Sequence, residues 1–268
     1  MHAAVERYAR HRRESDQWAL GRFVVPASRL EELAAARGND PDTWRLSVLL
    51  GDDAGADIAA ATASARASMG RVIADSAEIR VARGDAPDRM TRLHAIVPHD
   101  VQLFIEIEPA EGLDDRLRAI AAAGAHAKIR TGGITAEMFP SPANVVAFLR
   151  GCLRHGLSFK ATAGLHHPVR SRFRLTYQPD APLATMYGFL NLFVAAAFLH
   201  AGADDDRVLA ILTSEEPHAF SFTDSAARWA DAELSLHQIV SARERFALSF
   251  GSCSFEEPMR ELRDLALL

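Results

Sequence analysis

The sequence predicts an α/β fold, specifically a (β/α)8 TIM-type barrel that forms a single domain over residues 1–268. Three observations lead to this prediction. The length of 268 residues is close to the roughly 250 typical of such barrels. Short apolar segments alternate with Ala-rich helical stretches, the pattern of a parallel sheet covered by helices. No G-x-G-x-x-G follows the first apolar segment, which disfavours a dinucleotide-binding sheet.

Seven segments are expected as strands because they are short, apolar and bounded by turn residues. They are residues 22–26, 45–50, 78–82, 102–108, 126–130, 158–162 and 247–251. Helices are expected between them, for example over 57–69, 113–123 and 142–155. The last of these has a Ser cap and a Pro at its first position, and Gly156 closes it.

The strand count leaves two questions open. Residues 220–222 form either an extra strand or part of an insertion, and the chain opens on a helix instead of a strand. A missing or unusual first strand is therefore an alternative. A helical insertion is expected near residues 175–244, as a cover for the functional rim or as structural padding.

The composition gives no reason to expect nucleic-acid or membrane binding, because 30 basic and 35 acidic side chains leave a net charge of −5. The two cysteines, Cys152 and Cys253, are expected as small buried side chains in a cytoplasmic protein. The segment between Asp180 and Asp204 lacks charged residues, and we expect a buried helix there in place of a membrane span. Homo-oligomerisation stays open.

Charged and polar residues fall on one parity of four expected strands. These pairs are Glu78 and Arg80, Glu106 and Glu108, Lys128 and Arg130, and Lys160 and Thr162. Alternate residues of a strand point to the same side, so these side chains are expected to converge on the barrel axis. Burying unpaired charges costs several kcal/mol each, so an ion-pair network or a ligand site is required. We favour a site.

A buried lysine suits covalent chemistry with a carbonyl compound. Desolvation and the neighbouring cations Arg130 and Lys160 would lower the pKa of Lys128 and give a nucleophilic amine. Glu106 would relay protons. The expected partner is therefore a small-molecule carbonyl substrate, and no metal or cofactor is assigned.

Two short motifs carry a family resemblance. They are Lys128-Ile129-Arg130-Thr131-Gly132 and Lys160-Ala161-Thr162-Ala163-Gly164. Over roughly residues 103–164 the chain resembles the deoxyribose-phosphate aldolases, class I aldolases on a (β/α) barrel. The resemblance implies a lyase in which Lys128 forms a Schiff base and Lys160 perturbs the pKa of Lys128. It also implies that Ser252 belongs to a Gly-Ser segment at the rim of the barrel, later in the chain. Glu106 would stand where the family has an aspartate.

The chain departs from this family after Gly164, where His166-His167-Pro168 replaces the phosphate-binding Gly-Gly-Ile-Arg. The substrate need not be a sugar phosphate. Either histidine is expected in a structural, acid/base or hydrogen-bonding role, which is favoured over a metal pair. Thr131-Gly132-Gly133 could cradle an anion or simply turn the chain. The expected substrate-binding residues are Arg130, Thr131, Gly132, Glu108, Arg80, Thr162, His166, His167, Ser252 and Asn191.

Two alternatives to the aldolase remain. One is a metal- or acid/base-dependent isomerase or hydrolase that uses Glu106, Glu108 and His166. The other is a non-catalytic ligand-binding barrel in which Lys128 and Lys160 pair with the two glutamates.

Overall fold

The computed structural model describes residues 1–85 and 88–268, and the chain divides into two compact units. The first unit comprises Met1–Glu106 and Ala122–Ala125, and the second comprises Ile107–Ala121 and His126–Leu268. Compactness does not test whether the units fold independently, so the single-domain expectation stays a prediction.

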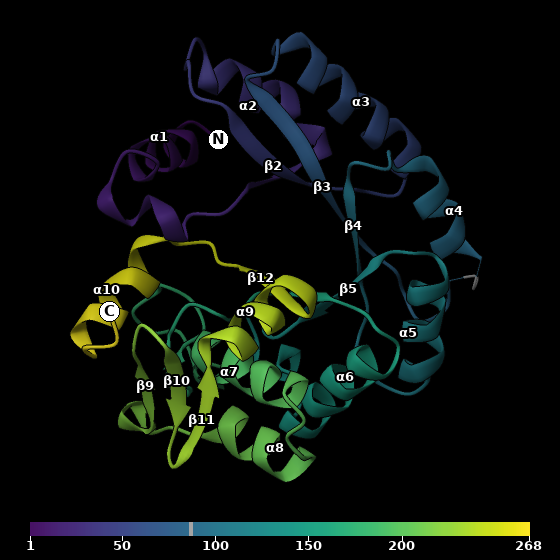
Figure 1. Cartoon of the computed structure of the whole chain (residues 1–268). Helices are drawn as coiled ribbons and strands as arrows, with labels where there is room; N and C mark the ends of the chain where they lie inside the picture. Colours follow the sequence, from purple (N-terminus) through teal and green to yellow (C-terminus); the bar gives the residue numbers. More distant parts are fainter. Residues whose placement is uncertain (86–87) are drawn as a thin grey trace. The chain divides into compact units, whose positions relative to one another are not determined.

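The first unit is a parallel sheet with helices (Figure 1). Its strands, in the order β1-β2-β3-β4, are β1 (Phe23–Pro26), β2 (Trp44–Leu49), β3 (Val72–Arg80) and β4 (Gln102–Glu106). Its helices are α1 (His2–His11), α2 (Leu30–Arg37), α3 (Ala54–Ala67) and α4 (Arg89–Ile96), with short 3-10 turns η1 (Ser15–Ala19) and η2 (Ala27–Arg29). The Trp44 ring on β2 is fully buried and lies 4.6 Å from Tyr8 of α1, so apolar burial fixes α1 on the sheet.

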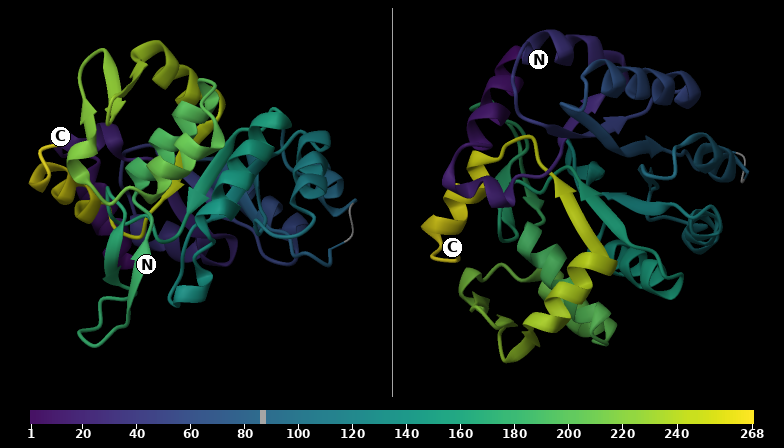
Figure 2. Two further views of the ribbon diagram at one scale, coloured as in Figure 1. Left: turned by 90° about the horizontal axis from the view of Figure 1, so that it is seen from below. Right: turned by 45° about the horizontal axis from the view of Figure 1, so that its top comes forward.

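The second unit combines a parallel sheet with two small antiparallel sheets (Figures 1 and 2). The parallel strands are β5 (His126–Arg130), β6 (Phe159–Thr162) and β12 (Ala247–Gly251). The antiparallel strands are β7 (Ser171–Arg174) with β8 (Leu183–Met186), and β9 (Phe220–Phe222) with β10 (Ala226–Trp229) and β11 (Ala232–Ser235). The helices are α5 (Leu113–Ala122), α6 (Pro142–Arg154), α7 (Phe189–His200), α8 (Asp205–Thr213), α9 (Leu236–Arg245) and α10 (Glu256–Asp264), with η3 (Ala136–Met138) and η4 (Pro217–Ala219).

The α/β class is confirmed, and a strand forms at each of the seven predicted positions. Six of these strands lie within two residues of the expected bounds, whereas β3 begins at Val72, six residues before the expected start. The start of α6 follows the predicted chemistry, because the Ser141 side chain accepts a hydrogen bond from Asn144 N and Pro142 opens the helix. Gly156 closes it with a φ of 66°. The parallel strands in the described part of the chain number seven, so a complete eight-stranded barrel is not confirmed.

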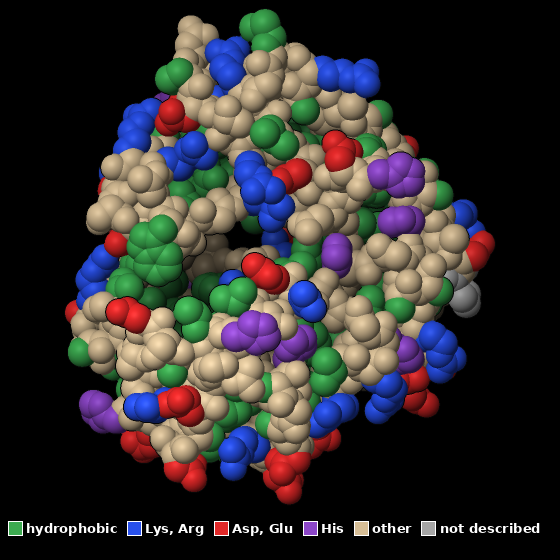
Figure 3. All heavy atoms as spheres, in the orientation of Figure 1, with side chains coloured by type: hydrophobic (Ala, Val, Ile, Leu, Met, Phe, Trp, Pro, Cys, Tyr) green, Lys and Arg blue, Asp and Glu red, His purple; other side chains and the backbone are tan. Residues whose placement is uncertain are grey.

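The predicted helical insertion contains strands as well as helices. Residues 220–222 become β9, which pairs antiparallel with β10, so this segment belongs to the insertion and adds no parallel strand. The uncharged segment between Asp180 and Asp204 forms β8 and the twelve-residue helix α7, and most side chains of α7 are buried. No helix among residues 1–85 and 88–268 is long and apolar enough to cross a membrane. On the face shown in Figure 3, basic and acidic side chains are interspersed, as a near balance of charges predicts.

The ends of β5 and β6 are joined by a close backbone approach. A Cβ placed on Gly132 would lie 2.9 Å from the Cα of Gly164 and 2.7 Å from the Phe139 ring. Thr131 supports this contact, because its hydroxyl donates to the carbonyl of Ala163 at 2.7 Å. Thr131 and Gly132 therefore hold the carboxyl ends of β5 and β6 together by packing and hydrogen bonding.

We predict that Gly132→Ala destabilises the protein by about 1–3 kcal/mol, because the added methyl group overpacks a contact made by backbone atoms. Urea unfolding followed by circular dichroism measures the change. Gly21→Ala is the matched control, since a Cβ there meets nothing within 4 Å. Equal stabilities of the two variants would contradict the packing role of Gly132.

Candidate functional site

Two lysines of the second unit lie side by side on its parallel sheet. Lys128 on β5 is the register partner of Lys160 on β6, so both side chains point to the same face. Each is only 6% exposed. At the strand ends Arg130 pairs with Thr162, and Arg130 is exposed while Thr162 is half-buried. The alternation in the sequence thus produces a sheet face with two buried cations below a polar end.

Two of the expected site residues belong to the first unit. Arg80 on β3 and Glu106 on β4 are register partners, which places opposite charges at adjacent positions of that sheet. Glu106 is buried and Arg80 is exposed. Glu78, also on β3, is buried and accepts a hydrogen bond from Ser47. Glu108 falls in the second unit, where it is exposed and its backbone carbonyl accepts a hydrogen bond from Arg116 at 2.6 Å.

The loop after β6 carries His166 and His167 and is held by the start of α7. The backbone amide of Phe189 donates to His167 O at 2.9 Å, and that of Leu190 donates to Pro168 O at 2.9 Å. These contacts use amides of the first helical turn that have no partner within the helix. The start of α7 therefore holds the backbone of this loop in place.

Asn191 completes this support from within α7. Its side-chain carbonyl accepts a hydrogen bond from Arg170 N at 2.7 Å, and its amide donates to Ile211 O at 2.7 Å and Ser214 O at 2.8 Å. The residue is fully buried. The structure thus gives Asn191 three backbone partners and a positioning role for the histidine loop.

Polar side chains from three other segments meet at His166 of this loop. Cys253 Sγ, in the turn after β12, lies 3.6 Å from His166 Nδ1. The same nitrogen lies 3.6 Å from Glu257 Oε2 of α10. Tyr177, in the β7–β8 connection, donates to Glu257 Oε2 at 3.0 Å and lies 3.9 Å from Cys253 Sγ. Ser252 is exposed beside them and accepts a hydrogen bond from Ser254 N.

The contacts in this cluster change the acidities of its members. The hydrogen bond with Cys253 raises the pKa of His166 above its ordinary value, and the nearby charge of Glu257 adds to this against the effect of burial. The hydrogen bond with His166 lowers the pKa of the Cys253 thiol. Burial, followed by the bond to Glu257, raises the pKa of Tyr177. The raised pKa makes the imidazole of His166 a stronger base, and it lies beside a more acidic thiol.

The two cysteines, both expected to be buried, differ in their exposure. Cys152 is buried as predicted, and burial raises the pKa of its thiol. Cys253 is exposed, so the prediction of a second buried cysteine is wrong. The reason is its position in the turn between β12 and α10, where the side chain leaves the sheet.

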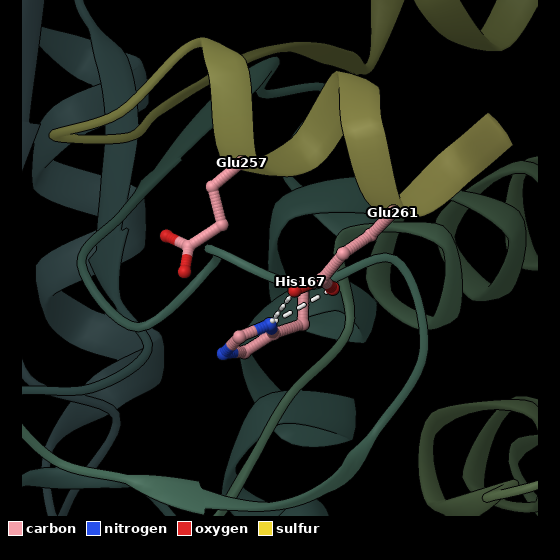
Figure 4. Close-up of side chains that lie close together, drawn as sticks. All are labelled: His167, Glu257 and Glu261. Atoms are coloured by element: carbon pink, nitrogen blue, oxygen red, sulfur yellow. Dashed lines mark hydrogen bonds and ion pairs between the residues drawn. The ribbon is translucent and has the colours of Figure 1, made fainter. Parts of the chain in front are cut away.

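A second group of side chains could hold a metal ion. His167, Glu257 and Glu261 each offer one ligand atom, and these atoms all lie within 4.8 Å of one another. Figure 4 shows the side chains of Glu257 and Glu261 extending from α10, with the Glu261 carboxylate against the imidazole of His167. His167 Nδ1 bonds to both oxygens of Glu261 at 2.9 Å, and its ring stacks on Phe173 with the centroids 3.4 Å apart. The ring is therefore fixed, whereas the two glutamates are long and half-buried.

Comparisons with known proteins give little further guidance. No protein-family model and no curated protein matches the chain. The crystal structure of the Bacillus cereus spore cortex-lytic enzyme SleL matches with a TM-score of 0.38 and 10% sequence identity. The match covers 91% of this chain, and the chain spans 65% of the length of that protein. A similarity at this level carries no argument about function.

The expected membership of the deoxyribose-phosphate aldolases is wrong. No protein-family model matches the chain, so none supports the resemblance. The motif Lys-x-x-Thr-Gly has a packing explanation here, since Thr131 bonds to Ala163 and Gly132 lies against Gly164. The place of the family's phosphate loop holds His167 beside two carboxylates, which would repel a phosphate. The expectation that Lys128 forms a Schiff base in a lyase reaction is therefore wrong as well.

Sequence reasoning missed Tyr177, Glu257 and Glu261. One signal was present, because Glu257 and Glu261 are four residues apart and so share one face of α10. Nothing in the sequence linked that face to His167, which is 94 residues from Glu261. The β7–β8 connection likewise brings Tyr177 within reach of a residue 80 positions away.

We predict that Asn191→Ala lowers the free energy of unfolding by about 3 kcal/mol, because one buried and two partly buried backbone groups lose their partner. Chemical unfolding measures this loss. Asn144→Ala is the control, since Asn144 is exposed on α6 and its replacement should change stability by less than about 0.5 kcal/mol. Similar losses for both variants would show that the Asn191 bonds do not hold the loop.

Proposed function

We propose that the protein is an acid/base-dependent hydrolase that acts on a small acyl substrate. The single observation that carries this proposal is the convergence of His166, Glu257, Tyr177 and Cys253 at distances of 3.0–3.9 Å. His166 and Cys253 are 87 residues apart in the sequence, and Tyr177 and Glu257 are 80 residues apart. His166 follows the carboxyl end of β6 by four residues, and ligands commonly bind at this edge of a parallel sheet.

In the proposed reaction His166 acts as the general base. Its imidazole takes a proton from a water molecule as the water oxygen bonds to the carbonyl carbon of the substrate. Glu257 supports the resulting imidazolium, and Tyr177 keeps that carboxylate in place through its hydrogen bond. When the tetrahedral intermediate collapses, the bond from carbon to the leaving group breaks. The leaving group receives the proton from His166, which restores the neutral imidazole.

The strand residues supply the substrate-binding part of the proposal. Lys128 and Lys160 are adjacent buried cations on one sheet face, and Arg130 and Thr162 continue that face to the strand ends. Positive charge and hydroxyl groups in such a place suit a substrate that carries a carboxylate. Arg80 and Glu106 lie in the first unit and the proposal does not depend on them.

We predict that His166→Asn lowers kcat/KM for a 4-nitrophenyl ester of a short dicarboxylic acid by about 100-fold or more, since general-base catalysis contributes at least this much. Initial rates of nitrophenol release measure the effect. Cys253→Ser should retain most of the activity, because water and not the thiol attacks the substrate.

His218→Asn is the matched control, because His218 is an exposed histidine in the same unit. Its activity should equal that of the unmodified protein. Hydrolysis that survives His166→Asn, or that Cys253→Ser abolishes, would contradict the proposed mechanism, and the second result would indicate a thiol nucleophile.

A further inference from the structure

We infer that His167, Glu257 and Glu261 bind one divalent transition-metal ion and that Zn²⁺ is the ion these ligands fit best. The inference concerns a binding site and stands apart from hydrolysis. Only the part that the ion would play in catalysis rests on the proposed function.

The geometry of the three side chains is the first argument. Their ligand atoms lie within 4.8 Å of one another, whereas ligands around a zinc ion at about 2.1 Å are separated by about 3.4 Å. A shift of about 1 Å in the two carboxylates would therefore close the set around an ion. The imidazole needs no such shift, because His167 is 8% exposed and stacked on Phe173.

The charges of α10 are the second argument. Glu257 and Glu261 stand four residues apart on one helix face, and like charges at this spacing destabilise a helix. Both side chains leave the same side of α10, where the Glu261 carboxylate meets the imidazole of His167 and the Glu257 carboxylate lies beside it (Figure 4). A cation between them would remove this repulsion, which gives the arrangement a physical purpose.

The donor types select the class of ion. One imidazole nitrogen with two carboxylate oxygens suits zinc and similar transition metals, whereas magnesium prefers oxygen ligands alone. Three protein ligands also leave a coordination position for water or substrate, as in catalytic zinc sites. The donor set therefore points to an exchangeable, reactive site and not to a closed structural one.

Outer contacts would hold two of the ligands in place. Tyr177 and His166 both contact Oε2 of Glu257, so the second oxygen of that carboxylate can serve the ion. The His167 backbone is fixed by Phe189 N. Such outer contacts orient the ligands of metal sites and raise their affinity. At this position the ion would polarise the carbonyl group that the proposed hydrolase attacks.

The test is calorimetric titration of Zn²⁺ into the full chain after treatment with a chelator that is then removed. We expect one ion per chain, and Mg²⁺ under the same conditions should bind at least about 100-fold more weakly, because the site includes an imidazole. No zinc binding, or equal binding of Mg²⁺ and Zn²⁺, would overturn the inference.

Variants assign the ion to these residues. Glu261→Gln and Glu257→Gln should each weaken zinc binding about tenfold or more, since each removes a charged ligand. His167→Asn should do the same, and circular dichroism establishes whether this buried position still folds. The matched control is Glu256→Gln, an exposed neighbour on α10 outside the cluster, which should bind zinc normally. Unchanged affinity in both glutamate variants would place the ion elsewhere and refute the site.

The readout separates this inference from the proposed function. Zinc binding without any hydrolysis would support the metal site and refute the hydrolase. Hydrolysis that persists at full rate with a chelator present would support the hydrolase and leave the bound ion without a catalytic part.

Discussion

The close approach of Gly132 and Gly164 is the constraint on which the candidate site depends. Only hydrogen atoms fit between these backbones, since a Cβ on Gly132 would lie 2.9 Å from Gly164. The contact sets the ends of β5 and β6 level, in the register that pairs Lys128 with Lys160. It also fixes the point from which the chain departs towards the histidines. Displacing either strand by one residue would turn its lysine to the opposite face.

From that point the site is assembled by backbone contacts and not by the functional side chains themselves. The first turn of α7 and the Asn191 amide hold the loop that carries His166 and His167. The turn after β12 then adds Cys253, and α10 adds two glutamates. Buried hydrogen bonds of this kind are costly to break, so the loop can keep the imidazoles in place while the longer glutamate side chains adjust. This division between fixed histidines and adjustable carboxylates is what the proposed metal site would require.

The false family resemblance has an instructive cause. In this chain Thr131 and Gly132 stand where two parallel strands end side by side. Threonine supplies a hydroxyl for a neighbouring carbonyl, and glycine permits close backbone contact. A short motif of this type reports a packing solution, and it implies a reaction only when the surrounding side chains agree. Here Glu257 and Glu261 lie beside His167, and their negative charges would disfavour a bound phosphate.

The sequence by itself determined the local structure and the face of the strands that carries charge. Alternation and capping predicted the seven parallel strands, the α6 helix with its Ser141 cap, and the shared parity of Lys128 and Lys160. These features depend on neighbours a few residues apart. Only the tertiary structure decided that His167 meets Glu261, 94 residues later, and that Cys253 is exposed beside His166. Contacts of that kind depend on how the strands and helices pack, and no local pattern in the sequence encodes them.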